Sequence, residues 1–131
     1  MTTGSYRPLS QDGILDLLEQ AHHCRIGLLN GGVPYVIPVN FLWRFDEGRL
    51  FFLLRFPAQS KKISLLKENN RVALEFEAVC KNIIKTVLVS GEVISIGRIS
   101  GFGCVSIEIL TLEASGREYF DYEFEGETEN E

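Results

Sequence analysis

Ser60, Lys61 and Lys62 open a short predicted helix with side chains that suit anion binding. Ser60 is a favoured N-cap residue, and the segment KKISLLKE behind it has apolar residues at helical spacing. A helix N-terminus carries partial positive charge, so each lysine in its first turn costs about 0.3 to 1 kcal/mol. A bound phosphate monoester would offset that cost, because free N–H groups and ammonium groups all attract it. The alternative is that both lysine side chains extend into solvent.

The other reactive side chains form no recognisable catalytic motif. His22 and His23 end a predicted helix, where a cation suits the helix dipole, and Glu75 and Glu77 share one face of a predicted strand. The sequence contains no HExxH, no GxSxG and no Cys/His set with metal-ligand spacing. We therefore predict no metal site and leave the catalytic residues unknown. Any redox chemistry is expected to come from a cofactor.

The cysteines and the N-terminal segment favour a cytoplasmic protein. Cys24, Cys80 and Cys104 are odd in number and lack CxxC spacing, which predicts buried free thiols in a reducing compartment. The segment MTTGSYRPLS has no apolar stretch typical of a signal peptide, and no apolar run is long enough to span a bilayer. We expect no membrane partner.

Charge is distributed unevenly along the 131 residues, whose net charge is −5. Residues 118–131 hold seven acidic residues and no basic one, whereas the rest holds thirteen basic and eleven acidic residues. We therefore predict one domain over 1–117 and an acidic C-terminal tail over 118–131. Neither the tail nor the first nine residues is expected to form an ordered element in the monomer. A nearly neutral body with an acidic tail argues against a nucleic-acid-binding barrel.

Hydrophobic periodicity predicts a mainly β fold with two helices and six strands. Short connections between most strands imply antiparallel neighbours, and six such strands usually close into a barrel. The leading helix begins at Ser10 and the second helix follows the third strand. The predicted strands are 24–30, 33–41, 49–54, 72–79, 85–96 and 105–114.

Three residues predict departures from regular strand pairing. Pro34 and Pro38 cannot donate hydrogen bonds to a neighbouring strand, so they place the second strand at a sheet edge or at a bulge. Gly91, in the middle of the fifth strand, predicts a bulge or a close backbone approach.

The order of these segments resembles the FMN-binding split β-barrel family, also called the pyridoxamine 5′-phosphate oxidase-like superfamily. The likeness is greatest to its small members related to the nitroimidazole-resistance proteins. It begins with VPYVIPVNF, a turn, GRLFFLL and the SKKI helix start, and it extends over most of residues 6–118. It implies a six-stranded antiparallel split barrel with a leading helix and a short inserted helix after strand three.

The resemblance also implies an FMN cofactor lying between the two protomers of a homodimer. The implied cofactor-binding residues are Val39, Asn40 and Phe41 along the flavin ring, Leu53 and Leu54 on its other contact strand, Ser60, Lys61 and Lys62 at the phosphate, and Thr86 from the partner subunit.

Two positions depart from the family pattern. Relatives often carry a histidine near the flavin, where this sequence has Leu53. Relatives also carry a long helical segment before the closing strand, where this sequence has only GRISGFG. The shorter segment either opens the cleft or leaves space for Tyr119–Phe124, and either departure is also consistent with loss of flavin binding.

The resemblance implies an FMN-dependent oxidoreductase that passes electrons from a reduced nicotinamide to a small acceptor. Nothing in the sequence selects among a nitroaromatic, a quinone and a pyridoxamine-type amine. The alternative is a non-catalytic split-barrel dimer that stores or senses FMN or has lost the cofactor, and Leu53 favours this alternative.

Overall fold

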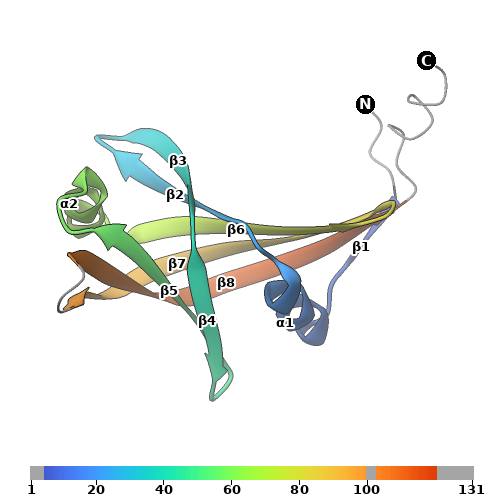
Figure 1. The fold of residues 1–131 in the computed structure, drawn as a ribbon. Coiled ribbons are helices and arrows are strands. Elements are labelled where there is room, and N and C mark those ends of the chain that lie inside the picture. The colour runs from blue at the N-terminus through green and yellow to red at the C-terminus, as the bar shows by residue number, and fades with distance from the viewer. Residues whose placement is uncertain (1–4, 100–102, 121–131) are drawn as a thin grey trace.

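A computed structural model of the chain describes residues 5–99 and 103–120 (Figure 1). They form one antiparallel sheet with two helices beside it. None of the helices in these residues is long and apolar enough to cross a membrane. The elements are β1 (Ser5–Pro8), α1 (Gln11–Gln20), β2 (Cys24–Asn30), β3 (Val33–Val39), β4 (Phe41–Asp46), β5 (Arg49–Pro57), α2 (Lys61–Glu68), β6 (Arg71–Cys80), β7 (Ile83–Ile99) and β8 (Cys104–Phe120).

The strand order explains why the barrel is split. Along the sheet the strands run β3-β2-β6-β7-β8-β5-β4, and β1 pairs with β8 outside this path. The two edge strands, β3 and β4, are consecutive in the chain and meet at Asn40. The sheet therefore curls toward closure without pairing its two edges (Figure 1). The predicted mainly β, antiparallel split-barrel fold with two helices is confirmed.

The number of strands differs from the predicted six, because the described residues form eight. The predicted strand 33–41 ends at Val39, where the chain leaves β2 and begins to pair with β5. This change of partner divides the segment into β3 and β4. The second strand beyond the predicted six is β1, which pairs with the C-terminal end of β8.

Residues 5–8 form a strand that the sequence did not predict. In β1, Arg7 forms an ion pair with Glu118 at 2.6 Å, and the rings of Tyr6 and Tyr119 lie 5.7 Å apart. Strand β8 continues to Phe120, three residues past the predicted domain boundary at 117. These contacts give the short β1 a partner over its whole length. The remaining part of the predicted tail, 121–131, lies outside the described residues.

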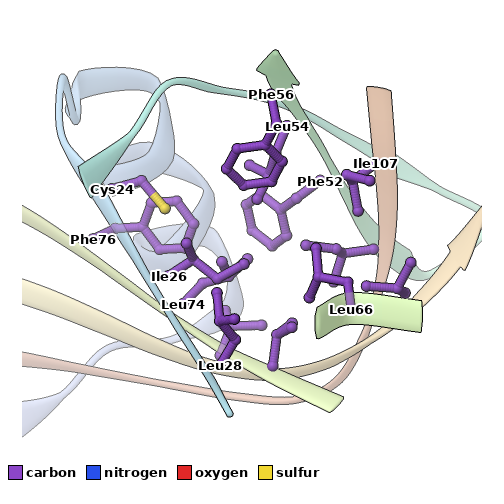
Figure 2. Packing of buried hydrophobic residues seen from close by; sticks show 14 of the residues in the cluster. Cys24, Ile26, Leu28, Phe52, Leu54, Phe56, Leu66, Leu74, Phe76 and Ile107 are labelled. Carbon is purple, nitrogen blue, oxygen red and sulfur yellow. The ribbon is translucent and has the colours of Figure 1, made fainter. Parts of the chain in front are cut away.

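The core is apolar throughout, and no polar or charged residue of the described chain is fully buried. The rings of Phe52 and Phe76 stack with centroids 4.9 Å apart, and Phe41 meets Phe76 edge-on at the same distance. Side chains from β2, β5, β6, β8 and α2 converge around these rings (Figure 2). Burial of this apolar surface is the main driving force for the fold.

Both helices begin at the predicted caps. The Ser10 hydroxyl accepts a hydrogen bond from the Gly13 N–H at 3.1 Å, and the Ser60 hydroxyl accepts one from the Lys62 N–H at 3.2 Å. Helix α1 buries Leu17 and Leu18, and α2 buries Ile63, Leu65 and Leu66.

The predicted irregularities also occur. Pro34 and Pro38 lie in the edge strand β3, which pairs only with β2. The pairing of β7 with β8 shifts register between Ser90 and Gly91. A Cβ atom on Gly91 would lie 2.6 Å from Ile109 Cγ2, so the backbone approaches closely there.

Candidate functional site

The N-terminal turn of α2 concentrates positive charge. Ser60 caps the helix, no acidic residue lies in the first turn, and neither Lys61 nor Lys62 forms an ion pair within the described chain. Lys61 is exposed and Lys62 is half-buried. The helix dipole and two lysines without an ion-pair partner in the described residues therefore place positive charge at this turn, which suits a multiply charged anion.

Strand β5 leads into this turn, and its side chains alternate between the two faces of the sheet. Leu54 is fully buried and points into the core (Figure 2), whereas Leu53 is half-buried on the opposite face. Of the two leucines predicted to line the flavin ring, only Leu53 faces outward. Arg55 is exposed on the same face as Leu53. No role was predicted for Arg55, although the two-residue strand period places it on that face.

The junction of β3 and β4 contains the other predicted ring contacts. Val39 is half-buried and pairs with Cys24, Asn40 is exposed between the two strands, and Phe41 pairs with Leu54. The Phe41 ring contacts Phe76 and therefore points toward the core. Among these three residues, Asn40 alone has a polar side chain, and it is exposed.

A cleft of about 360 Å³ lies beside this junction, next to the end of α1. Asn40, Phe41 and Trp43 line it, together with His22. The sequence pattern identified His22 only as a residue at a helix terminus. Its place in the cleft depends on the tertiary arrangement that puts the end of α1 near Asn40–Trp43, which no local sequence pattern reveals.

Thr86 lies apart from the other predicted site residues. It is the fourth residue of β7 and pairs with Glu77 and Arg117. Strand β7 begins at the hairpin with β6, at the opposite end of the sheet from α2 (Figure 1). Within one chain, the pairing of β4 with β5 places the β3–β4 junction beside β5, and the end of β5 leads into α2. Thr86 lies near neither of these two parts of the site.

Carboxylates and one exposed thiol also lie on the outside of the sheet. Arg25 forms an ion pair with Glu75 at 2.9 Å, and partial burial raises the pKa of Glu77, with a further contribution from its hydrogen bond to Glu75. Cys80 is exposed, so the prediction that the cysteines are buried is wrong for this residue. In residues 5–99 and 103–120, no three His, Cys, Asp or Glu side chains come together as a metal site requires.

Burial makes Cys24 unsuitable as a nucleophile. It raises the pKa of the thiol to about 12, with a smaller contribution from the negative charge of Glu75. The reactive thiolate is therefore almost absent at neutral pH.

The outer face of β2, β3, β6 and β7 exposes apolar side chains. Val36 is 64% exposed and Leu88 is 56% exposed, and both line a groove of about 420 Å³ with Ala73. Arg25 and Glu75 lie at the same groove. This combination of apolar centre and charged groups is typical of a protein interface.

Comparison with known proteins gives one family and several similar structures. The family described as pyridoxamine 5′-phosphate oxidase matches residues 10–94. No curated protein matches the sequence.

Three solved structures illustrate the likeness in fold. A FAD-binding protein from Mesorhizobium loti has a TM-score of 0.73 and 21% identity, covering 86% of this chain and 97% of that one. A candidate 5-nitroimidazole antibiotic resistance protein from Bacteroides thetaiotaomicron has a TM-score of 0.72 and 16% identity, covering 90% of both chains. The FAD-binding protein from Mycobacterium smegmatis has a TM-score of 0.69 and 23% identity, covering 88% of this chain and 99% of that one.

Proposed function

Because this chain belongs to the pyridoxamine 5′-phosphate oxidase family, we propose that it is an FMN-binding oxidoreductase. In this proposal it transfers electrons from a reduced nicotinamide to a small acceptor. The observation that carries it is the first turn of α2, where Lys61 and Lys62 lie without any acidic neighbour in that turn. Two similar folds are described as FAD-binding and a third as an F420 reductase, which supports a flavin-type cofactor.

The charge at α2 suits the phosphate of FMN. FMN ends in a phosphate monoester with a charge of about −2 at neutral pH. Two unneutralised lysines at a helix N-terminus match the monoester. Ser60, Lys61 and Lys62 would hold this phosphate.

The flavin ring would lie toward Leu53 and Asn40, the outward-facing residues of the predicted ring contacts. A bound flavin supplies the hydride and electron chemistry, so the protein's residues would bind, orient and shield it. The buried side chain of Leu54 and the half-buried ring of Phe41 would support this surface from the core side.

We further propose a homodimer. Thr86 lies far from α2 within one chain, so it can complete the cofactor site only from the partner subunit. The apolar groove around Val36, Ala73 and Leu88 offers a surface for this contact. Leu88→Asp would place a charge in that contact, and we expect it to yield monomers by light scattering while the fold is retained. A dimer that persists in this variant would exclude this surface.

A non-catalytic dimer that binds FMN without turnover is the second candidate. Leu53 gives the outer face of β5 an apolar side chain beside the proposed ring position. That face therefore offers no proton donor at Leu53 for a reaction at the flavin.

Absorbance separates these functions. Purified protein supplemented with FMN should show a bound-flavin band at about 450 nm that is retained through gel filtration. Bleaching of this band by NADH or NADPH under anaerobic conditions supports the oxidoreductase, and a bound but unreduced flavin supports the carrier. A protein that binds no FMN would overturn both proposals.

The phosphate position is tested by the double variant Lys61→Ala/Lys62→Ala. We expect FMN affinity to fall by about tenfold or more, because two charge-assisted contacts are lost. The thermal midpoint of the apo form should stay equal or rise, because cations at the helix N-terminus are unfavourable. Lys67→Ala, in the last turn of α2, is the matched control and should keep the affinity of the parent. Unchanged affinity in the double variant would remove the phosphate assignment.

A further inference from the structure

A carboxylate lies beside Leu53 on the outer face of β5. Glu108 of β8 pairs directly with Leu53, and Leu42 of β4 pairs with Leu53 from the other side. Directly paired residues of antiparallel strands share a face of the sheet, with Cβ atoms about 4.5 to 5.5 Å apart. The Glu108 side chain therefore stands on the same face as Leu53, which is the face proposed to carry the flavin ring. The sequence analysis assigned Glu108 no role.

Arg44 holds this carboxylate from the opposite side of β5. Its Nη1 atom donates a hydrogen bond to Glu108 Oε2 at 2.8 Å, and its guanidinium carbon lies 4.1 Å from the centroid of the Phe51 ring. Arg44 pairs with Phe51 on β5, whereas Glu108 pairs with Leu53. The two charged side chains therefore meet over β5 between these residues. Their ion pair borders Leu53 on the side away from α2, because β5 continues from Leu53 toward α2.

The ion pair is accessible from the outer face. The Arg44 side chain is 55% exposed and the Glu108 side chain is 25% exposed. Arg44, Phe51 and Leu53 line one shallow cleft of about 140 Å³, together with Leu42. This volume is below the range of about 300 to 1,000 Å³ for a whole small-molecule site, so the cleft suits one part of a larger ligand. A planar ring resting on Leu53 would cover the cleft that Arg44 lines.

The two charges cancel while both residues are present. Removing either one leaves a single unbalanced charge beside an apolar surface, because Leu42 and Leu53 carry none. A flavin becomes more negative when it is reduced at neutral pH, and charge near the ring changes its reduction potential. By Coulomb's law, an unbalanced cation favours the reduced flavin and an unbalanced anion favours the oxidised flavin.

We propose that Arg44 and Glu108 together set the reduction potential of the flavin bound against Leu53. This inference rests on the proposed flavin-binding function and adds two residues to it. In this protein the polar groups beside the ring come from the strands on either side of β5, and Leu53 supplies an apolar contact.

Reduction potentials of the FMN-loaded full chain test the proposal, measured anaerobically by absorbance against a reference dye. At a fixed ratio of reduced to oxidised dye, Glu108→Gln should raise the ratio of reduced to oxidised flavin by about fivefold or more, because it leaves the Arg44 cation unbalanced. Arg44→Gln should lower that ratio by a similar factor. The double variant Arg44→Gln/Glu108→Gln should return close to the parent, because its surface is neutral again.

A control variant removes a charge from the same hairpin at a greater distance. Asp46 pairs with Arg49, four residues before Leu53, so it lies about 13 Å along the strand from the ring position. This distance exceeds the Debye length of about 8 Å at physiological salt, so Asp46→Asn should change the flavin ratio by less than about twofold.

The direction of the shifts separates this proposal from a structural role. If the ion pair only stabilises the sheet, both single variants should lose stability without moving the potential in opposite directions. A protein that binds FMN but shows unchanged potentials, or shifts of the same sign in both single variants, would overturn this inference and leave FMN binding in place. A protein that binds no FMN would overturn the proposed function together with it.

Discussion

The two faces of β5 differ in composition and in what they can do. On the inner face, Leu50, Phe52, Leu54 and Phe56 are all buried. On the outer face, the Arg44 guanidinium lies 4.1 Å from the centroid of the Phe51 ring, and Leu53 and Arg55 remain accessible. A single strand therefore stabilises the fold on one side and presents the candidate cofactor surface on the other.

Strand β6 shows the same division. Val72, Leu74 and Phe76 point into the core, whereas Glu75 and Glu77 lie on the other face. Burying a charge without a partner is costly, so ionisable groups collect on the face that water or a partner can reach. The inner face is therefore constrained by packing, and the outer face is free to vary with function. Four substitutions test this difference.

Phe52→Ala should give the largest loss of stability, and Phe51→Ala is its matched control. Phe52 is 1% exposed and stacks on Phe76, so its removal should cost about 3 to 5 kcal/mol. Phe51→Ala removes a half-buried ring and its contact with Arg44, which we expect to cost about 1 kcal/mol. Urea unfolding of both variants measures the difference. Equal losses would contradict the division between the faces.

Gly91→Ala should have the next largest effect. Its Cβ atom would lie 2.6 Å from Ile109 Cγ2 and 3.1 Å from the Leu110 carbonyl oxygen, so core atoms must shift at a cost of about 1 to 3 kcal/mol. At Gly97, the nearest atom to a new Cβ is Ser106 Oγ at 3.8 Å. Gly97→Ala should therefore be neutral or slightly stabilising by thermal denaturation. A Gly91→Ala protein as stable as the parent would show that the bulge relaxes readily.

Burial of Cys24 should make the stability of the protein fall at alkaline pH. Burial raises the pKa of Cys24 from 9.0 to about 12, so the unfolded chain loses this proton first as pH rises. The stability that the neutral thiol contributes is complete below about pH 9 and is lost as pH rises toward 12. Between pH 8 and 10, the parent should lose about 1 kcal/mol more than Cys24→Ala, measured by urea unfolding. Equal slopes for the parent and Cys24→Ala would refute the buried-thiol account.

Arg25→Ala should have the smallest effect. Its ion pair with Glu75 lies on the accessible face, with 48% of the arginine side chain exposed. Such pairs contribute about 0 to 1 kcal/mol, and less at high salt. Thermal melts at low and high salt should show a small difference that shrinks as salt is added. A loss as large as that of Phe52→Ala would mean that the outer face also determines folding.

Much of the local structure could be predicted from the sequence. Ser10 and Ser60 identified both helix starts, the prolines identified the edge strand, and Gly91 identified the bulge. Each of these signals lies within a few residues of the structure it specifies. Strand β1 could not be predicted in this way, because Ser5–Pro8 has no apolar pattern and is held by pairing with the distant end of β8.

The candidate site was less accessible to sequence analysis. Its local part, the cap and two lysines of α2, was predicted and has the expected helical geometry. The place of His22 in a cleft and the separation of Thr86 from α2 follow from which strands and helices become neighbours. The roles of these residues toward a cofactor stay predictions.

The sequence by itself determined which face of each strand is apolar, where the helices begin and where positive charge gathers, because these properties depend on neighbours two to four residues away. Only the tertiary structure decided that β3 and β4 separate at Asn40 and that the Thr111 hydroxyl is buried without a hydrogen-bond partner in the described chain. These features arise from pairings between segments far apart in the chain. Their geometry is set when the whole core packs, and no local pattern of residue types encodes it.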